Sequence, residues 1–403
     1  MNIHYGGIEV ITFLHAADLH LDRPQSLPAG LTPAEEEYIQ QTAERALHAL
    51  VREAAAREVD FVLVSGDLYH YEKRSLHAQW QFHQACLELE KVNIPVYVIH
   101  GNHDPETGAQ RMELPGNVSV FSSEGGMYQL NVRGQNVHLY GFSYPEKAYV
   151  EEPYSFYEKS GEDGFHIAML HGQEKGQSGH DPYAPFSTSV LKQTGMDYWA
   201  LGHIHKPLVL SEDPPIIYSG SLTGAVRSET GPRGAYYVTL TPSEPAEWEF
   251  VPLADVERVH AALSLDGIHT WNQLSTSIEK MLEQQRRCIL SVTISGSGPL
   301  SGEVTEERLR EWIKPSLEQD GHWLDSVRLE APPPAGSVDP EVESDIEEAA
   351  GWFLTGGVQV LEEEVQQSSM LRKHFSGFSE EEWEHITEEA AQSLKRKAAE
   401  YDR

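Results

Sequence analysis

The chain has 403 residues, of which 39% are hydrophobic and 23% are charged. This composition excludes a disordered or membrane-spanning class and fits two or three globular domains. The 30 basic and 63 acidic residues give a formal net charge of −33. The overall field of the protein therefore does not attract nucleic acid, and any contact with a phosphate polymer has to be local.

The sequence carries no targeting or membrane signal. Its two cysteines, Cys86 and Cys288, are too few for a disulfide framework. The first ten residues have no basic flank followed by an apolar run, and no apolar segment approaches the ~20 residues that span a bilayer. We therefore expect a cytoplasmic protein that has no signal peptide and does not contact a membrane.

Short runs of Val, Ile, Leu and Phe predict strands that are buried on both faces. The runs are residues 10–14, 61–64, 96–99, 137–140, 167–170, 198–201, 216–218 and 236–240. Two segments between the first three runs have apolar side chains at helical spacing, at Ala43, Ala46, Leu47, Leu50, Val51 and Ala54 and at Leu76, Trp80, His83 and Leu87. This alternation predicts a layered α/β core with right-handed crossovers and a ligand site at the carboxyl ends of its strands.

The pattern changes after the Pro/Ser/Glu-containing stretch 241–247. We expect a small α/β unit made of a strand at 256–265, a helix at 271–287, a strand at 289–294, a helix at 305–317 and a strand at 324–329. The sequence 331–337, Ala-Pro-Pro-Pro-Ala-Gly-Ser, is a stiff linker by composition. The predicted domains are therefore a layered α/β domain at 1–250, a small α/β domain at 251–335 and a helical C-terminal extension at 336–403.

One helix of the extension is well marked. Ser379 and Glu382 form a predicted capping box, and the helix that follows carries an apolar stripe. The stripe consists of Trp383, Ile386, Ala390 and Leu394. We expect it to pack on its own chain, although a partner protein is the alternative.

Histidine is unusually frequent, with 20 in the chain. Polar residues follow five predicted strands, namely Asp18 and His20, Asp67 and His70, Asn102 and His103, His171, and His203 and His205. Carboxylates and imidazoles together suit divalent ions such as manganese, iron or zinc, whereas a structural zinc would favour thiolates. Seven of these residues could be metal ligands, which is more than one ion requires. They fit two ions ~3.5–4 Å apart that share a carboxylate and act on a phosphoester.

The motifs D-x-H (18–20), G-D-x-x-H (66–70), G-N-H-D (101–104), H-G (171–172) and G-H-x-H (202–205) occur in this order. Over about residues 10–240, this series resembles the calcineurin-type metallophosphoesterase superfamily. The resemblance implies a layered metallophosphoesterase β-sandwich flanked by helices. It also implies hydrolysis of a phosphoester by a metal-bridging hydroxide that attacks phosphorus. The glycines of the motifs, at positions 66, 101, 172 and 202, are expected to allow tight turns close to the ions.

Carried over by position, the family pattern implies roles for nine residues. Asp18, His20 and His205 would hold one ion, Asn102, His171 and His203 the other, and Asp67 would bridge them. His103 resembles the catalytic histidine of the family and His70 is a second catalytic candidate. The alternatives are that His103 only orients a ligand and that His70 is a hydrogen-bonding rim residue without a catalytic role. We expect two divalent ions, manganese first, with iron or zinc as alternatives.

Several residues near the motifs are more simply interpreted as structural or supporting residues. We expect His15 and His100 to be structural or to support a ligand. Asp104 is expected to buttress its turn or to orient His103. Arg227 and Arg233 could contact phosphate, but pairing with nearby acids such as Glu229 is the commoner case.

Further sequence features indicate the class of substrate. His70 after Asp67, the segment F-L-H-x-A-D-x-H-L-D at 13–22 and Tyr-Ser-Gly-Ser at 218–221 resemble the SbcD-type DNA repair nucleases, and in particular the YhaO group of Firmicutes. The α/β unit after residue 250 is similar in place and size to their capping domain. The resemblance implies a manganese-dependent DNA exonuclease or endonuclease that works with an SbcC-like coiled-coil ATPase, and a homodimer is also open.

Two other functions stay open at this point. One is hydrolysis of nucleotides, cyclic nucleotides or other small phosphodiesters, which the acidic composition favours. The other belongs to a different class, a non-catalytic scaffold subunit of an ATPase complex. The complete set of expected metal ligands argues against the scaffold.

Overall fold

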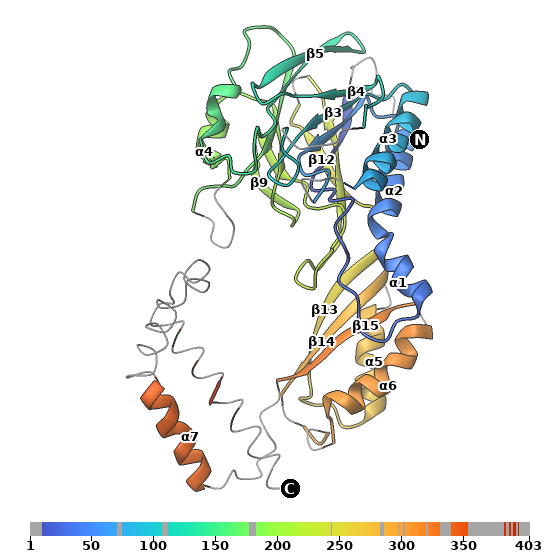
Figure 1. Cartoon of the computed structure of the whole chain (residues 1–403), viewed down its shortest axis with the longest axis vertical. Helices are drawn as coiled ribbons and strands as arrows, with labels where there is room; N and C mark the ends of the chain where they lie inside the picture. The colour runs from blue at the N-terminus through green and yellow to red at the C-terminus, as the bar shows by residue number, and fades with distance from the viewer. Residues whose placement is uncertain are drawn as a thin grey trace. The chain divides into compact units, whose positions relative to one another are not determined.

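The structure is a computed structural model. It describes residues 10–70, 75–106, 112–176, 183–242, 244–282, 286–296, 298–300, 303–319, 321–330 and 340–353, together with residues 383, 387, 390, 391 and 394. Helices and strands are both abundant in it, and the fold is mixed α/β as expected (Figure 1).

Two six-stranded sheets form the core of residues 11–252. The first has the order β12-β11-β1-β2-β3-β4 and contains β1 (Ile11–Ala16), β2 (Phe61–Ser65), β3 (Val96–Ile99), β4 (Val118–Val120), β11 (Gly234–Leu240) and β12 (Glu247–Pro252). The second has the order β5-β6-β7-β8-β10-β9 and contains β5 (Gly126–Val132), β6 (Gln135–Gly141), β7 (Phe165–His171), β8 (Tyr198–Gly202), β9 (Leu208–Glu212) and β10 (Pro215–Tyr218). All eight predicted strands of the core are present.

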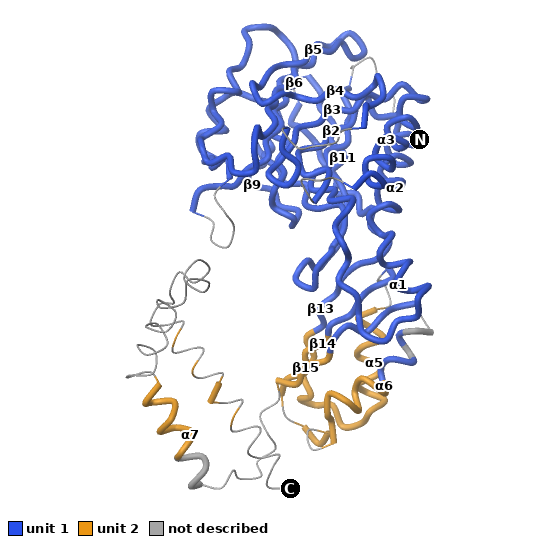
Figure 2. Tube along the Cα trace, in the orientation of Figure 1, with its two compact units in different colours: residues 1–261, 284–291, 313–326 blue, residues 262–283, 292–312, 327–403 orange. Residues whose placement is uncertain are grey.

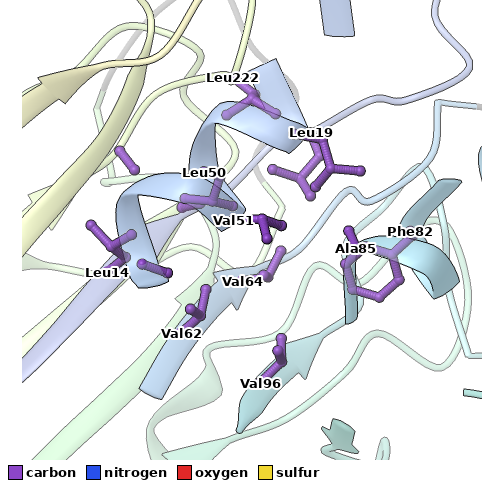
Figure 3. Packing of buried hydrophobic residues seen from close by; sticks show 14 of the residues in the cluster. Leu14, Leu19, Leu50, Val51, Val62, Val64, Phe82, Ala85, Val96 and Leu222 are labelled. Atoms are coloured by element: carbon purple, nitrogen blue, oxygen red, sulfur yellow. The ribbon is translucent and has the colours of Figure 1, made fainter. Parts of the chain in front are cut away.

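Strands β1, β2 and β3 are parallel neighbours in the first sheet. Helix α2 (Thr42–Ala56) connects the first two and helix α3 (Leu76–Lys91) connects the second and third. Because the side chains of a strand alternate between its faces, each strand supplies two cores. Leu14, Val62 and Val64 pack toward α2 and α3 (Figure 3).

The opposite faces of these strands meet the second sheet. Phe13, Phe61 and Leu63 belong to one buried cluster with Leu139 and Ile167 of β6 and β7. The outer face of the second sheet is covered by a third cluster that is rich in aromatic residues and includes Leu191 of the short helix α4 (Thr188–Gln193). A 3₁₀ turn, η1 (Pro153–Phe156), lies in the same region of the chain. The sandwich therefore fixes the ends of strands from both sheets.

The region after the core contains the expected small α/β pattern. Strands β13 (Val256–Ser264), β14 (Arg287–Ser295) and β15 (Trp323–Leu329) form a three-stranded sheet, and helices α5 (Trp271–Leu282) and α6 (Glu306–Gln319) lie between them in sequence. The chain divides into two compact units, residues 1–261, 284–291 and 313–326, and residues 262–283, 292–312 and 327–403 (Figure 2). The three predicted domains at 1–250, 251–335 and 336–403 stay a prediction.

The C-terminal extension is described only in part. Helix α7 (Pro340–Trp352) is followed by Phe353, whose ring lies 6.0 Å from that of Trp383. Trp383 is buried, so this member of the predicted stripe packs on its own chain, whereas Leu394 is exposed. The linker at 331–337, the capping box at Ser379 and Glu382, and Ile386 lie outside the described residues.

Helices α1 (Pro33–Gln40), α3, α4 and α5 differ from expectation: α4 was not predicted, and the helix expected at 271–287 ends earlier, because Arg287 already belongs to β14. Helix α1 was not predicted, although Thr32 and Glu35 form a capping box at its start and Pro33 is its first residue. Helix α3 was predicted, but its apolar stripe does not lie on the buried face. Leu76 and Trp80 are 65% and 49% exposed, while Ala78, Phe82, Ala85, Cys86 and Leu89 are buried. The buried side chains, both small and large, belong to the same cluster as Val62 and Val64 of the sheet.

Candidate metal centre

The ends of five strands deliver the predicted site residues to one place. Asp18 and His20 follow β1, Asp67 and His70 follow β2, Asn102 and His103 follow β3, His171 ends β7, and His203 and His205 follow β8. Backbone hydrogen bonds join the first two segments, because Asp18 N donates to Gly66 O and His20 N donates to Asp67 O, both at 3.0 Å. The first sheet supplies six of these residues and the second sheet three.

Four of these residues have a left-handed backbone that non-glycine residues rarely adopt. The φ angles are 49° at Asp18, 41° at His20, 53° at Asp67 and 100° at His203. Such conformations cost about 1–3 kcal/mol each and persist where the surrounding structure holds them. Their concentration at these strand ends marks a functional site.

Two glycines make room for the polar side chains. A Cβ atom at Gly101 would lie 2.3 Å from Asp67 Oδ1 and 2.7 Å from His171 Nε2. A Cβ atom at Gly202 would lie 1.9 Å from the carbonyl oxygen of Ser65. Gly101 therefore leaves space for Asp67 and His171, and Gly202 allows a strand end of the second sheet to touch one of the first.

Asp18, His20 and His205 form a first group that could hold a metal ion. The Nε2 atoms of His20 and His205 are 3.1 Å apart, and His205 Nε2 is 3.9 Å from Asp18 Oδ1. Two ring nitrogens at this separation converge on a common point. His20 Nδ1 is buried and has no hydrogen-bond partner among the described residues.

Asp18, Asp67 and His171 form a second group. His171 Nδ1 lies 3.0 Å from the carbonyl oxygen of Ser65, which can only accept a hydrogen bond, so Nε2 is left to face the cluster. His171 Nε2 lies 3.0 Å from Asn102 Oδ1 and 3.6 Å from Asp67 Oδ2. The ring of His203 is 5.3 Å from that of His171, and its backbone N–H donates to the carboxylate of Asp18.

Asp18 belongs to both groups, and Asp67 of the second group also faces His20 of the first. The Oδ2 atom of Asp67 is 3.7 Å from His20 Nε2 and 3.6 Å from His171 Nε2. Its Oδ1 atom accepts a hydrogen bond from the backbone N–H of His103 at 3.0 Å. The structure therefore brings all seven predicted ligands into one connected cluster, with the Asp67 carboxylate at its centre.

His103 and His70 lie at the edge of this cluster. Their rings stack with centroids 4.5 Å apart, and the ring of His20 meets both edge to face. His103 Nδ1 is 2.9 Å from the carbonyl oxygen of His70, so Nδ1 donates and Nε2 is the nitrogen free of that bond. The His70 backbone N–H in turn donates to Asp22 Oδ1 at 2.6 Å. The backbone of residue 70 therefore holds the ring of His103.

The electrostatics of the cluster fit a site for cations. Burial, together with the nearby imidazoles, lowers the pKa of His20 well below its usual value, and burial also lowers the pKa values of His171 and His103. It lowers the pKa of His70 to about 4. These rings are therefore neutral near pH 7, with lone pairs available to a metal. Burial and the nearby Asp104 and Asp18 raise the pKa of Asp67, so its negative charge needs a cation beside it.

Three of the neighbouring residues support the motifs. Asp104 accepts hydrogen bonds from the backbone N–H groups of Leu68 and Gly101 at 3.0 and 2.9 Å, and its carboxylate is 3.1 Å from His100 Nδ1. Asp104 thus stabilises the turn after β3, which was one of the two roles expected for it. His15 is fully buried between Tyr198 and the carbonyl of Leu201.

Glu229 and Arg23 were not predicted as site residues. Glu229 Oε1 is 2.6 Å from His205 Nδ1 and accepts a hydrogen bond from Arg23 Nη1 at 2.8 Å. Burial raises the pKa of Glu229, but His205 and Arg23 outweigh this effect and lower it to about 2. No motif marks Glu229, and the only sequence signal is its position eight residues after the Tyr-Ser-Gly-Ser segment.

The two arginines considered for phosphate contact are engaged elsewhere. Arg227 pairs with Asp325, with a second bond of 2.9 Å from Nη2 to Oδ1. Arg233 donates to the backbone carbonyls of His205 and Thr230. Glu229 was the expected partner of Arg227 or Arg233, but it pairs with Arg23 instead.

Known proteins match this chain in sequence. A model of the calcineurin-like phosphoesterase family matches residues 11–207. The uncharacterized metallophosphoesterase YhaO of Bacillus subtilis is 34% identical over 416 aligned positions, which cover 96% of this chain and 97% of YhaO. The chain belongs to the calcineurin-like metallophosphoesterases. This metallophosphoesterase is thus a member of a family of metal-binding hydrolases, as the five motifs predicted.

The metallophosphoesterase is also similar to two archaeal proteins named DNA double-strand break repair protein Mre11. That of Methanocaldococcus jannaschii is 30% identical over 178 residues, 42% of this chain and 47% of the relative. That of Archaeoglobus fulgidus is 23% identical over 240 residues, 52% of this chain and 49% of the relative. The chain thus matches about half the length of each Mre11.

Among the described residues, none of the helices combines the length and apolar character that crossing a bilayer requires.

Proposed function

We propose that this metallophosphoesterase is a dinuclear-metal phosphodiesterase that acts as a DNA exonuclease or endonuclease in DNA repair. The observation that carries the proposal is the position of Asp67. Its Oδ2 atom is at almost equal distance from His20 of the first metal-capable group and His171 of the second. A carboxylate shared in this way suits a pair of divalent ions.

The proposed ligands are Asp18, His20 and His205 for one ion and Asn102, His171 and His203 for the other, with Asp67 as the bridge. When bound, two divalent ions would supply charge stabilisation for the phosphate oxygens and lower the pKa of a water molecule. Oxygen and imidazole ligands without thiolates suit manganese, with iron or zinc as alternatives. The convergent nitrogens of His20 and His205 support this assignment.

His103 is the proposed catalytic residue. The carbonyl of His70 holds its Nδ1–H, which directs Nε2 to act on the substrate. An imidazole in this position can stabilise the leaving oxygen or give it a proton. The stack of the His70 ring on His103 supports a role for His70 in the same step, since moving one ring moves the other.

DNA is the proposed substrate because both Mre11 relatives are named for DNA double-strand break repair. The motif resemblance over residues 13–22 and 218–221 points the same way. We further propose an SbcC-like coiled-coil ATPase as partner, because the net charge of −33 leaves a grip on DNA to be supplied by another protein. Assembly as a homodimer and a cytoplasmic location belong to the same proposal.

A second candidate function is hydrolysis of nucleotides or other small phosphodiesters. The observation in its favour is the same net charge, because a small substrate needs only the cations of the site and no basic surface around it. The two functions predict different preferences between an oligonucleotide and a small phosphodiester.

The test is an assay on end-labelled DNA and on bis(p-nitrophenyl) phosphate, after removal of metals and addition of Mn²⁺, Fe²⁺ or Zn²⁺. We expect degradation of DNA with Mn²⁺ and none after chelation. Asp67→Ala should abolish activity, and His103→Ala should reduce kcat by about 10²–10⁴. His77→Ala, at an exposed position on α3, is the control. Full activity in Asp67→Ala would remove the site assignment, and hydrolysis of the small ester alone would favour the second function.

A further inference from the structure

Glu229 makes a contact with the candidate metal centre that the motifs do not explain. It lies in the loop between β10 and β11, and one of its carboxylate oxygens is 2.6 Å from His205 Nδ1. The other oxygen accepts the backbone N–H groups of Ala225 at 2.6 Å and Val226 at 3.1 Å. Both oxygens are thus engaged, and the carboxylate cannot turn away from His205 without losing bonds to its own loop.

The contact fixes the tautomer of His205. An ionised carboxylate only accepts hydrogen bonds, so the proton of the neutral ring has to be on Nδ1. The lone pair is then on Nε2, which lies 3.1 Å from His20 Nε2 and 3.9 Å from Asp18 Oδ1. Arg23 Nη1 donates to the same carboxylate oxygen at 2.8 Å and also lies 3.3 Å from His205 Nδ1, but the shorter contact of Nδ1, at 2.6 Å, is the one with the Glu229 carboxylate, which requires the proton on Nδ1.

The same loop also holds the backbone of His205. The carbonyl oxygen of His205 accepts a hydrogen bond from Ser221 N at 2.9 Å and another from Arg233. A Cβ atom at Gly220 would lie 2.8 Å from this oxygen, so the glycine permits the approach. The Tyr-Ser-Gly-Ser segment therefore holds the backbone of His205, and Glu229 holds its ring.

Two other histidines of the site are held differently. His171 Nδ1 faces the neutral carbonyl of Ser65, and His20 Nδ1 has no hydrogen-bond partner among the described residues. A carboxylate makes the imidazole that donates to it a stronger metal ligand than a carbonyl does. His205 should therefore contribute a large share of the affinity of its half of the site.

We propose that Glu229 is a positioning residue that holds His205 in the Nδ1–H tautomer and thereby sets the affinity of the Asp18–His20–His205 group for a divalent cation. This inference rests on the proposed two-metal function. It assigns Glu229 to one of the two metal positions and leaves the group around His171 independent of it.

The test compares the full-length protein with Glu229→Gln, which has almost the same shape. The glutamine oxygen can keep the bond to Ala225 N, and its amide then donates toward His205 Nδ1. That forces the ring proton onto Nε2, where it blocks metal binding. Glu249→Gln is the matched control, because it removes an acid–arginine pair with Arg57 and contacts no histidine in the described structure.

Metal-free protein is titrated with Mn²⁺ by calorimetry. We expect two sites in the wild type and in Glu249→Gln. In Glu229→Gln we expect one site to weaken by about 10–100-fold while the other is unchanged. Two sites of wild-type affinity in Glu229→Gln would overturn the role of Glu229 and leave the proposed function intact. No Mn²⁺ binding by the wild type would overturn both.

A second measurement does not need the variant to fold. In the metal-free wild type, ¹⁵N NMR of labelled histidines reports which ring nitrogen of His205 carries the proton, and His205→Asn identifies the signal. We expect the proton on Nδ1, and on Nε2 in Glu229→Gln. A proton on Nε2 in the wild type would contradict the proposal.

Discussion

Three imidazoles of the metal centre donate Nδ1–H to an oxygen that only accepts. The oxygens belong to Ser65 for His171, His70 for His103 and Glu229 for His205. In each case Nε2 is the nitrogen left for the cluster. His15, which is also buried, differs because its Nε2 bonds to the backbone carbonyl of Leu201 and its Nδ1 to the hydroxyl of Tyr198, so neither nitrogen faces another residue of the cluster. The hydrogen-bond partner of each ring therefore separates the site histidines from a structural one.

His15 predicts how stability depends on pH. Its Nε2 donates to the carbonyl of Leu201, and burial lowers its pKa to about 3. The unfolded chain takes up the proton near pH 6.5, so the neutral folded ring is penalised as the pH falls from 6.5 toward 3. At pH 5.5 this group should lower the free energy of unfolding by about 1.4 kcal/mol relative to pH 7.5.

Urea unfolding at the two pH values measures this effect. In His15→Gln the decrease between pH 7.5 and 5.5 should be smaller than in the wild type by about 1.4 kcal/mol. His77→Gln, at an exposed position, should keep the wild-type decrease. An equal decrease in wild type and His15→Gln would contradict a neutral buried ring at position 15.

The sequence predicted residues at strand ends better than residues in loops. Asp18, Asp67 and His203 stand within four residues of the ends of apolar runs, so the strand pattern alone indicated a common edge. Glu229 stands in a loop without periodicity, and only the folded chain brings it to His205. Asp22, which accepts the backbone N–H of His70, was likewise hidden because its partner is 48 residues away in the chain.

At the scale of elements, the site depends on the close approach of the two sheets. Gly202 ends β8 in the second sheet, and Ser65 ends β2 in the first. There is no space for a side chain at position 202, because its Cβ would lie 1.9 Å from Ser65 O and 2.9 Å from His171 Nδ1. His203 follows Gly202 directly and Asp67 lies two residues after Ser65, so the sheet separation determines the geometry of the site.

Gly202→Ala should therefore damage both stability and metal binding. We expect the free energy of unfolding to fall by at least about 1–3 kcal/mol, the usual cost of overpacking. Mn²⁺ affinity should fall as well, since His171 and Asp67 have to move. Gly126→Ala in β5 is the control, because a Cβ there meets nothing within 4 Å. Denaturant unfolding and Mn²⁺ calorimetry measure the two effects, and wild-type values for Gly202→Ala would rule out this dependence.

Helices show what a residue pattern leaves undecided. The spacing of Leu76 and Trp80 correctly indicated a helix, yet the buried face carries Ala78 and Phe82. Small residues such as Ala78 and Ala85 form part of that face beside Phe82, and a search for large apolar residues overlooks them. Helix α1 had a readable capping box at Thr32 and Glu35, but its mostly polar composition gave no apolar stripe.

For the whole molecule, the net charge of −33 has to be reconciled with a DNA substrate. Arg23, Arg227 and Arg233 are each engaged by carboxylates or carbonyls of the protein itself. Phosphate contacts should then be few and should depend on the divalent ions. Binding driven by so few contacts releases few counterions from DNA.

This reasoning predicts a weak dependence on monovalent salt. Each phosphate neutralised by a basic side chain contributes a slope of about −0.9 to log K against log salt, so one or two contacts lower affinity by less than about 20-fold between 50 and 200 mM KCl. The measurement is kcat/KM on end-labelled DNA at fixed Mn²⁺, with the small ester as control for effects on chemistry. A loss of about 10³-fold or more would instead require six or more basic contacts. Such a loss would contradict the proposal that a partner protein supplies most of the DNA contacts, because the chain would then carry a basic surface of its own.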